Sequence, residues 1–152
     1  MSKEKNSAQG NKKANFTKAE KSFLLQQEAC RVATCFNDKP HVTPVSYIFD
    51  GDNNFLYFAT DYDSKKFKNL KRNNNVSVAI DVYKSSTDNS AVIVEGTAEF
   101  IDQGDEFRRL YDLFYERFEW VRKDQWKEGE APFVKINPIS KISWGLEVDD
   151  LK

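Results

Sequence analysis

The chain has 152 residues, of which 39% are hydrophobic and 14% aromatic, and this suits one compact globular domain with a sizeable core. The formal net charge of -1 gives no support for a general polyanion-binding role, so we expect no nucleic-acid partner. The apolar runs stay well below the ~20 residues that a membrane span needs. Residues 1–15 are rich in Lys, Asn and Ser without an apolar segment. We therefore expect a disordered polar tail over 1–15, a single domain over 16–152 and a cytoplasmic location.

The first third of the chain predicts a helix followed by two strands. The helix spans residues 16–29, with Thr17 as N-cap and Glu20 in capping-box spacing. The strands span residues 31–36 and 41–49 and flank a polar turn. This order places an entry helix ahead of a β-hairpin.

A third strand runs directly into a lysine-rich helix. Residues 55–58 are an apolar strand, and Ser64 is a good N-cap for a helix over residues 65–72. The free N–H groups of a first helical turn carry the positive end of the helix dipole and favour an anion. Lys65 and Lys66 oppose that dipole, so they indicate an anionic partner such as a phosphate. The alternative is an ordinary surface helix whose lysines are solvated.

The second half of the chain predicts three more strands and a long helix. The strands span residues 76–82, 91–101 and 132–146, the second interrupted by Gly96 and the third bent at Asn137-Pro138, and residues 83–90 form a polar loop. An apolar stripe at helical spacing predicts a helix over residues 107–121 that packs against a sheet. The pattern predicts a mainly β (α+β) fold, a small antiparallel barrel with flanking helices.

Cysteine and histidine usage offers little for a metal or nucleophile site. Cys30 and Cys35 fall on opposite faces of a strand, which favours two buried thiols over a disulfide. His41 is the single histidine, and the spacings typical of zinc ligands are missing, so we expect no metal. A hydrolase that pairs a cysteine with His41 would lack an orienting third group. The sequence therefore assigns no catalytic residues.

Short segments in a fixed order carry a family resemblance. They are Arg31-Val32-Ala33-Thr34, Pro40-His41-Val42-Thr43-Pro44-Val45-Ser46-Tyr47, Leu56-Tyr57-Phe58-Ala59-Thr60, Ser64-Lys65-Lys66, Asn69-Leu70, Val92-Ile93-Val94-Glu95-Gly96-Thr97-Ala98-Glu99, Ile136-Asn137-Pro138 and Lys141-Ile142-Ser143-Trp144. Over about residues 16–148 the chain resembles the pyridoxamine 5'-phosphate oxidase-like family, the FMN-binding split barrels. The resemblance implies a six-stranded antiparallel split β-barrel with flanking helices.

The resemblance also implies an FMN site and assigns its phosphate end. The family's phosphate clamp is a Thr followed a few residues later by Ser-Arg-Lys, and Thr60, Ser64, Lys65 and Lys66 stand in those places. Lys65 replaces the usual arginine, which keeps the charge but loses the bidentate fork. The deazaflavin F420 is the alternative cofactor, because many split barrels bind it.

The ring end of the flavin site and a homodimer follow from the same resemblance. Pro44, Val45, Ser46 and Tyr47 match the strand whose backbone runs along the isoalloxazine ring in such proteins. Trp144 matches the tryptophan that members contribute to the flavin pocket near the dimer interface, the alternative being a core aromatic. Members are usually homodimers with two FMN sites shared between subunits, which implies the same arrangement here.

The implied activity is flavin-mediated hydride or electron transfer on an unknown substrate. Oxidases of vitamin B6 phosphates carry a C-terminal Arg-x-His-Arg-type segment, whereas residues 145–152 are acidic here, so we expect a different substrate. A non-catalytic flavin binder with a stress or sensory role is the alternative, since the sequence has no recognisable acid–base cluster.

Overall fold

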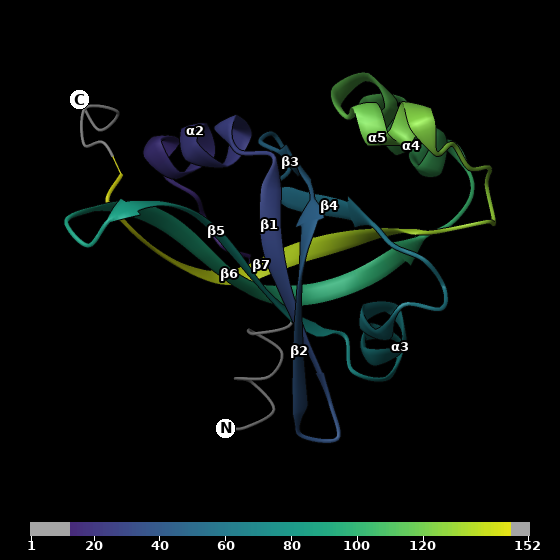
Figure 1. Ribbon diagram of the computed structural model, residues 1–152, viewed down its shortest axis with the longest axis horizontal. Coiled ribbons are helices and arrows are strands. Elements are labelled where there is room, and N and C mark those ends of the chain that lie inside the picture. The colour runs from purple at the N-terminus through teal and green to yellow at the C-terminus, as the bar shows by residue number, and fades with distance from the viewer. Residues whose placement is uncertain (1–12, 147–152) are drawn as a thin grey trace.

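The computed structural model describes residues 13–146 (Figure 1). Its elements are α2 (Lys18–Gln26), β1 (Ala29–Phe36), β2 (Lys39–Ser46), β3 (Ile48–Asp50), β4 (Phe55–Ala59), α3 (Lys65–Arg72), β5 (Asn75–Ser85), β6 (Asp88–Ile101), α4 (Asp105–Arg117), α5 (Glu119–Lys123) and β7 (Phe133–Trp144). Residues 1–12 of the tail expected over 1–15, and residues 147–152 of the acidic C-terminal segment, lie outside the described residues. Ala14 is already buried, and its N–H donates to the Pro138 carbonyl (3.0 Å).

The strands form one antiparallel sheet in the order β2-β1-β5-β6-β7-β4-β3, curled into a half-barrel (Figure 1). The described chain has seven strands, so the expected number of six is wrong. The expected strand over residues 41–49 is divided at Tyr47, whose N–H donates to the Glu28 carbonyl (3.0 Å) and whose hydroxyl donates to the Leu24 carbonyl (2.5 Å). Because these bonds turn the chain at Tyr47, β2 pairs with β1 whereas β3 pairs with β4.

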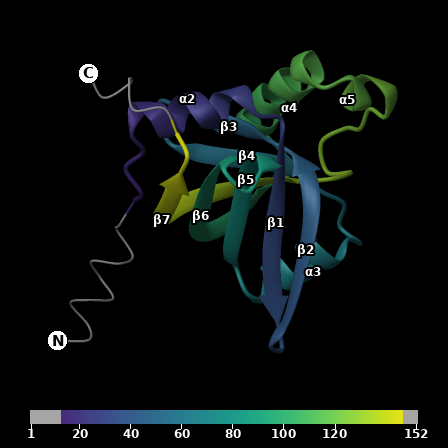
Figure 2. The same cartoon turned by 60° about the vertical axis from the view of Figure 1, so that its left-hand side comes forward.

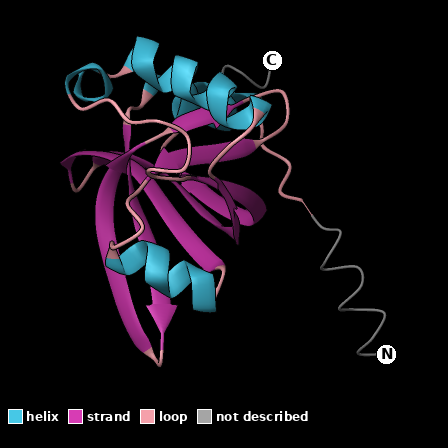
Figure 3. Cartoon of the chain, turned by 90° about the vertical axis from the view of Figure 1, so that its right-hand side faces the viewer, coloured by secondary structure: helices cyan, strands magenta, loops and turns pink. Residues whose placement is uncertain are grey.

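The helices lie in two places around the curled sheet. Figures 2 and 3 show α2, α4 and α5 along one end of it and α3 separate from them, beside β1 and β2. One apolar cluster fills the half-barrel, and a second joins α4 to the neighbouring strands. The members of the second cluster are Tyr57, Ile101, Phe107, Leu110, Phe114, Phe118, Val121 and Phe133. The predicted packing of an aromatic helical stripe against a sheet is confirmed.

The helix expected over residues 107–121 is broken, although its buried face is as predicted. α4 ends at Arg117, and Phe118 adopts an extended backbone (φ -118°, ψ 121°) before α5 begins. The Phe118 ring stays buried against Phe114, with centroids 5.5 Å apart. Tertiary packing therefore keeps the stripe inside while the backbone changes direction. This break sets the course of α5, which carries Trp120.

Two other boundaries differ from the sequence prediction. The entry helix stops at Gln26, because Gln27 is extended (φ -91°, ψ 159°) and β1 already begins at Ala29. The expected loop over residues 83–90 is mostly strand, with β5 reaching Ser85 and β6 starting at Asp88. Pairing across β5 and β6 overrides the polar composition of this segment.

A buried carboxylate fastens α2 to β7. Glu20 completes the predicted capping box with Thr17, accepting from the Thr17 N–H (2.9 Å). It also accepts from Lys141 Nζ (2.7 Å) and Ser143 Oγ (2.6 Å), although the Glu20 side chain is only 3% exposed. Burial alone would raise the pKa of Glu20, but these hydrogen bonds and the Lys141 charge outweigh it and hold the pKa below its usual range.

Candidate functional site

The predicted phosphate-clamp residues lie together at the N-terminus of α3. Ser64 is the N-cap, as predicted, and its Oγ accepts from the Phe67 N–H (3.2 Å). The hydroxyls of Thr60 and Ser64 are 2.8 Å apart, so the end of β4 is joined to the start of the helix. Lys65 and Lys66 form the first turn, where backbone N–H groups have no acceptor within the helix. Two hydroxyls, the free backbone N–H groups and two lysines therefore lie at the start of the same helix.

Buried polar contacts fix the position of α3. Asn69 Nδ2 donates to Thr34 Oγ1 (3.0 Å), and both residues are buried. Asn73 Nδ2 donates to the Cys35 carbonyl (3.0 Å). Since both acceptors belong to β1, the helix is held against the sheet by its polar side chains as well as by Leu70. The clamp thus stands on a rigid support.

The two lysines of the clamp differ in environment. Lys65 is exposed, whereas Lys66 is half-buried. Burial lowers the pKa of Lys66, and the charge of Asp61 partly opposes that shift. A desolvated ammonium interacts more strongly with an anion than a fully hydrated one does. Lys66 is therefore the stronger candidate for direct contact with a phosphate.

The predicted ring-binding strand is an edge of the sheet. β2 pairs with β1 on one side, where Pro44 faces Arg31 and Val45 faces Cys30. Its other edge bonds to no strand among residues 13–146, although β2 contacts β4 and α3. On the same strand, Thr43 Oγ1 is buried and has no hydrogen-bond partner among residues 13–146. The outer edge of β2 thus has backbone groups available to a ligand, as the sequence interpretation requires.

Tyr47 points away from that edge into the protein core. It is 1% exposed, and the hydrogen bonds to Leu24 and Glu28 occupy its hydroxyl and its N–H. Burial raises the pKa of Tyr47, and the nearby Cys30 adds to the shift. The phenol is therefore a structural anchor of the corner between β2 and β3.

Trp144 lies at the opposite end of β7 from the clamp. Phe133, at the start of β7, pairs with Ala59 beside the clamp, whereas Trp144 pairs with Ala91 on β6. Trp144 is 48% exposed, and its indole Nε1 donates to Asn89 Oδ1 (2.8 Å). A single chain therefore does not bring Trp144 to the other predicted residues.

Two tryptophans that the sequence interpretation missed lie beside the clamp. Trp120 Nε1 donates to Ser46 Oγ (3.1 Å), and the rings of Trp120 and Trp126 are nearly parallel, with centroids 5.9 Å apart. Together with six other residues they line a cavity of about 220 Å³; these are Ala59, Thr60, Asp61, Asp124, Glu130 and Ala131. The sequence signal that could have identified them is the presence of two tryptophans among the mostly polar residues 119–130.

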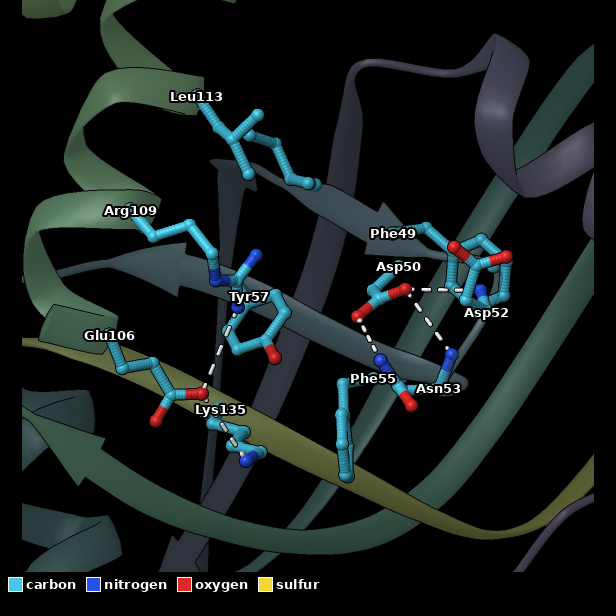
Figure 4. A pocket seen from close by; sticks show the side chains of 12 residues that line it. Phe49, Asp50, Asp52, Asn53, Phe55, Tyr57, Glu106, Arg109, Leu113 and Lys135 are labelled. Carbon is cyan, nitrogen blue, oxygen red and sulfur yellow. Dashed lines mark hydrogen bonds and ion pairs between the residues drawn. The ribbon is translucent and has the colours of Figure 1, made fainter.

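A larger cavity of about 710 Å³ lies elsewhere, between the β3–β4 hairpin, α4 and β7 (Figure 4). Glu106 stands between two cations, with Arg109 at 3.8 Å and Lys135 at 3.4 Å, and the Asp50 carboxylate accepts hydrogen bonds within its own turn. None of the predicted site residues lines this cavity. Its charged groups largely satisfy one another, so we place the candidate site at the clamp.

A family model described as pyridoxamine 5'-phosphate oxidase matches residues 16–139. The chain belongs to the pyridoxamine 5'-phosphate oxidase family. The resemblance drawn from the short sequence segments is thereby confirmed, and so is the split-barrel fold that it implied. A comparison with curated protein sequences gave no match.

Solved structures agree with this assignment. A conserved hypothetical protein from Mycobacterium tuberculosis has a TM-score of 0.72 at 22% identity, covering 91% of this chain and 89% of its own. General stress protein 26 from Bacillus anthracis str. Sterne has a TM-score of 0.63 at 26% identity, covering 85% and 95%. An FAD-binding protein from Mesorhizobium loti has a TM-score of 0.66 at 19% identity, covering 80% and 88%. These likenesses support the fold.

Within residues 13–146, no helix is long and apolar enough to cross a membrane. The same part of the chain holds no group of three or more His, Cys, Asp or Glu side chains arranged to hold a metal ion.

Proposed function

We propose that this member of the family binds FMN and acts as a flavin-dependent oxidoreductase. The observation that carries the proposal is the meeting of Thr60, Ser64, Lys65 and Lys66 at the start of α3. This donor set suits a phosphate dianion, because it offers two cations and the free N–H groups of a helical turn. Family membership and an FAD-binding structural neighbour support a flavin as the carrier of that phosphate.

The outer edge of β2 would hold the ring of the flavin. Alternate residues of an antiparallel strand turn their backbone groups to opposite edges, so either Val45 or the pair Pro44 and Ser46 presents its backbone to a ligand there, and Pro44 offers a carbonyl alone because it has no N–H. Thr43 Oγ1, buried and without a partner, is a further polar group for a ligand. The unpaired edge and this hydroxyl fit a ring whose rim carries both hydrogen-bond donors and acceptors.

A bound flavin supplies hydride or electron transfer, and the chain supplies binding, orientation and electrostatics. Lys66 and Lys65 would neutralise the phosphate, and the edge of β2 would orient the ring. The hydroxyls of Tyr47 and Tyr62 are engaged in other contacts, since Tyr47 donates to the Leu24 carbonyl and Tyr62 donates to Asp102 Oδ2 (3.3 Å). Proton transfer would then fall to the substrate or to water.

We propose further that the site is completed in a homodimer. Trp144 lies far along β7 from the clamp of its own chain, and its exposed indole has Ile142, 63% exposed, two residues away on the same strand. Two large apolar side chains that are exposed on one strand can be buried against a second copy of this chain. The partner's Trp144 could then reach the flavin that this chain's clamp holds. Light scattering of the purified protein tests the oligomeric state.

The experiment that tests the cofactor is a titration of the purified full chain with FMN and, separately, with riboflavin. We expect a perturbed flavin spectrum on binding and clearly tighter binding of FMN, since riboflavin lacks the phosphate that the clamp would hold. A protein that perturbs neither spectrum contradicts the proposal. Equal affinity for both flavins would leave flavin binding in place but would contradict the proposed contact between the clamp and the phosphate.

Two alternatives are tested with the same preparation. Titration with F420 decides between the deazaflavin and FMN, because only the true cofactor should bind tightly. A non-catalytic flavin binder is the second alternative, and it is favoured by the engagement of Tyr47 and Tyr62 in other contacts. Turnover with NADH or NADPH and candidate acceptors, measured against free flavin, separates an enzyme from a binder.

A further inference from the structure

The cavity beside the clamp has an aromatic wall that is held in place from three sides. Trp126 packs edge-on against Tyr111 (4.9 Å between centroids), and its backbone N–H donates to the Tyr111 hydroxyl (3.3 Å). It also packs against Phe133, at 5.7 Å. Trp120, parallel to Trp126, is bonded to Ser46. The indole wall is therefore a fixed part of the fold.

The charged residues that line the cavity all bear carboxylates. Asp61 follows β4, and Asp124 and Glu130 lie in the connection between α5 and β7; no basic side chain is among the described residues that line the space. Glu130 is held in part by the Lys127 N–H, which donates to its Oε1 (2.7 Å). Aromatic faces and carboxylates are the two groups that attract an organic cation, the first through the ring quadrupole and the second through charge.

We propose that this cavity binds a small organic cation of the ammonium type. The lining includes Thr60 of the clamp but neither of its lysines, so its three carboxylates disfavour an anionic ligand inside the cavity. The volume of about 220 Å³ is below the ~300–1,000 Å³ that drug-sized ligands occupy. A quaternary or alkylated ammonium suits the site best, because it is weakly hydrated and gains most from indole faces. The inference stands on the cavity itself and does not require that a flavin be bound at the clamp.

The test is calorimetric titration of the purified full chain with choline and with 3,3-dimethylbutan-1-ol, its neutral carbon analogue of the same shape. We expect saturable binding of choline and at least about tenfold weaker binding of the neutral analogue. Equal binding of the two, or no binding of choline, overturns the proposal. A failed FMN titration would leave this result unchanged, so the two proposals fail separately.

Variants place the binding in this cavity. Asp124→Asn combined with Glu130→Gln removes two charges from exposed positions and should weaken choline binding at least about fivefold. Glu95→Gln, an exposed carboxylate on β6, is the matched control and should leave binding unchanged. Trp126→Leu should abolish binding, and Trp126→Phe should retain part of it. If the control weakens choline binding as much as the paired variant does, the cavity is not the site.

Discussion

The indole of Trp120 donates a hydrogen bond to the hydroxyl of Ser46, with 3.1 Å between Nε1 and Oγ. This bond joins α5 to the end of β2 across 74 residues of sequence. It exists because α4 ends at Arg117 and the chain turns at Phe118 before α5 begins. One contact thus links the aromatic wall of the small cavity to the strand that we propose as the support of the flavin ring.

Replacing Trp120 with phenylalanine should cost about 0.5–1.5 kcal/mol of unfolding free energy, because the hydrogen bond to Ser46 and part of the indole's packing on Trp126 are lost. Ser46→Ala should cost a similar amount, and the double variant should be less destabilised than the sum of both. Urea unfolding of the four proteins measures the coupling. Strictly additive losses would show that the bond contributes nothing to stability.

Lys65→Arg should tighten FMN binding. A guanidinium offers two parallel N–H donors to a phosphate, whereas the ammonium of Lys65 offers a point charge, so we expect about a fivefold lower Kd, near 1 kcal/mol. Riboflavin, which has no phosphate, should bind both proteins equally. Lys68→Arg, an exposed position on the same helix, is the control. If Lys65→Arg raised the affinity for riboflavin as much as that for FMN, a contact between residue 65 and the phosphate would be contradicted.

Local patterns were sufficient to predict most elements of this fold, and long-range contacts account for the errors. The cap at Ser64 and the apolar face of α4 depend on residues near in sequence, and both were predicted correctly. The division of a strand at Tyr47 and the break at Phe118 carry no Gly or Pro signal. They arise from hydrogen bonds to α2 and from packing under α4, which single-sequence periodicity does not contain.

The candidate site was predictable only where its residues are close in sequence. Thr60, Ser64 and the two lysines lie within seven positions, and the structure keeps them together. Trp120 was missed, because its relation to Ser46 depends on how α5 returns to β2. Trp144 was predicted from the family resemblance alone, and within one chain it lies at the end of β7 that is farther from the clamp. Its proposed role therefore depends on a second copy.

The two thiols should differ sharply in reactivity. Cys30 is 1% exposed, and burial raises the pKa of its thiol to about 12, whereas Cys35 is partly accessible. Because the thiolate is the reactive form, a disulfide reagent at pH 8 should label one cysteine rapidly in the native protein and both in denaturant. Cys35→Ser should remove the rapid phase, and Cys30→Ser should leave it. Two equal rapid phases would contradict the buried position of Cys30.

Gly96 is required by the close approach of β6 and β7. A Cβ at this position would lie 2.2 Å from the Asn137 carbonyl oxygen, which is backbone that cannot move aside easily. Gly96→Ala should therefore cost about 2 kcal/mol or more, measured by thermal or urea unfolding. Gly51→Ala is the matched control, since its Cβ would meet only the Phe49 ring at 3.6 Å. Equal stability of the two variants would contradict the crowding.

Glu20→Gln should destabilise the protein, because it leaves the ammonium of Lys141 without its buried charge partner. Because the Lys141 side chain is 24% exposed and stays partly solvated, the loss should be about 1–3 kcal/mol, less than for a fully buried pair. The pKa of Glu20 in the folded protein lies below the ordinary value of 4.5. Its contribution to stability is therefore fully present above pH 4.5 and is lost as the pH falls through the folded-state pKa.

Urea unfolding between pH 3 and 7 tests this role of Glu20. The wild type should lose stability steeply below pH 4.5, and Glu20→Gln should lose less over the same range, because one titrating group has been removed. Glu99→Gln, an exposed carboxylate on β6, should keep the pH dependence of the wild type. Lys141→Met combined with Glu20→Gln should be less destabilised than the sum of the single variants, since neither charge is then left without its partner. Parallel pH profiles for wild type and Glu20→Gln would show that this carboxylate does not control the acid sensitivity of the α2–β7 contact.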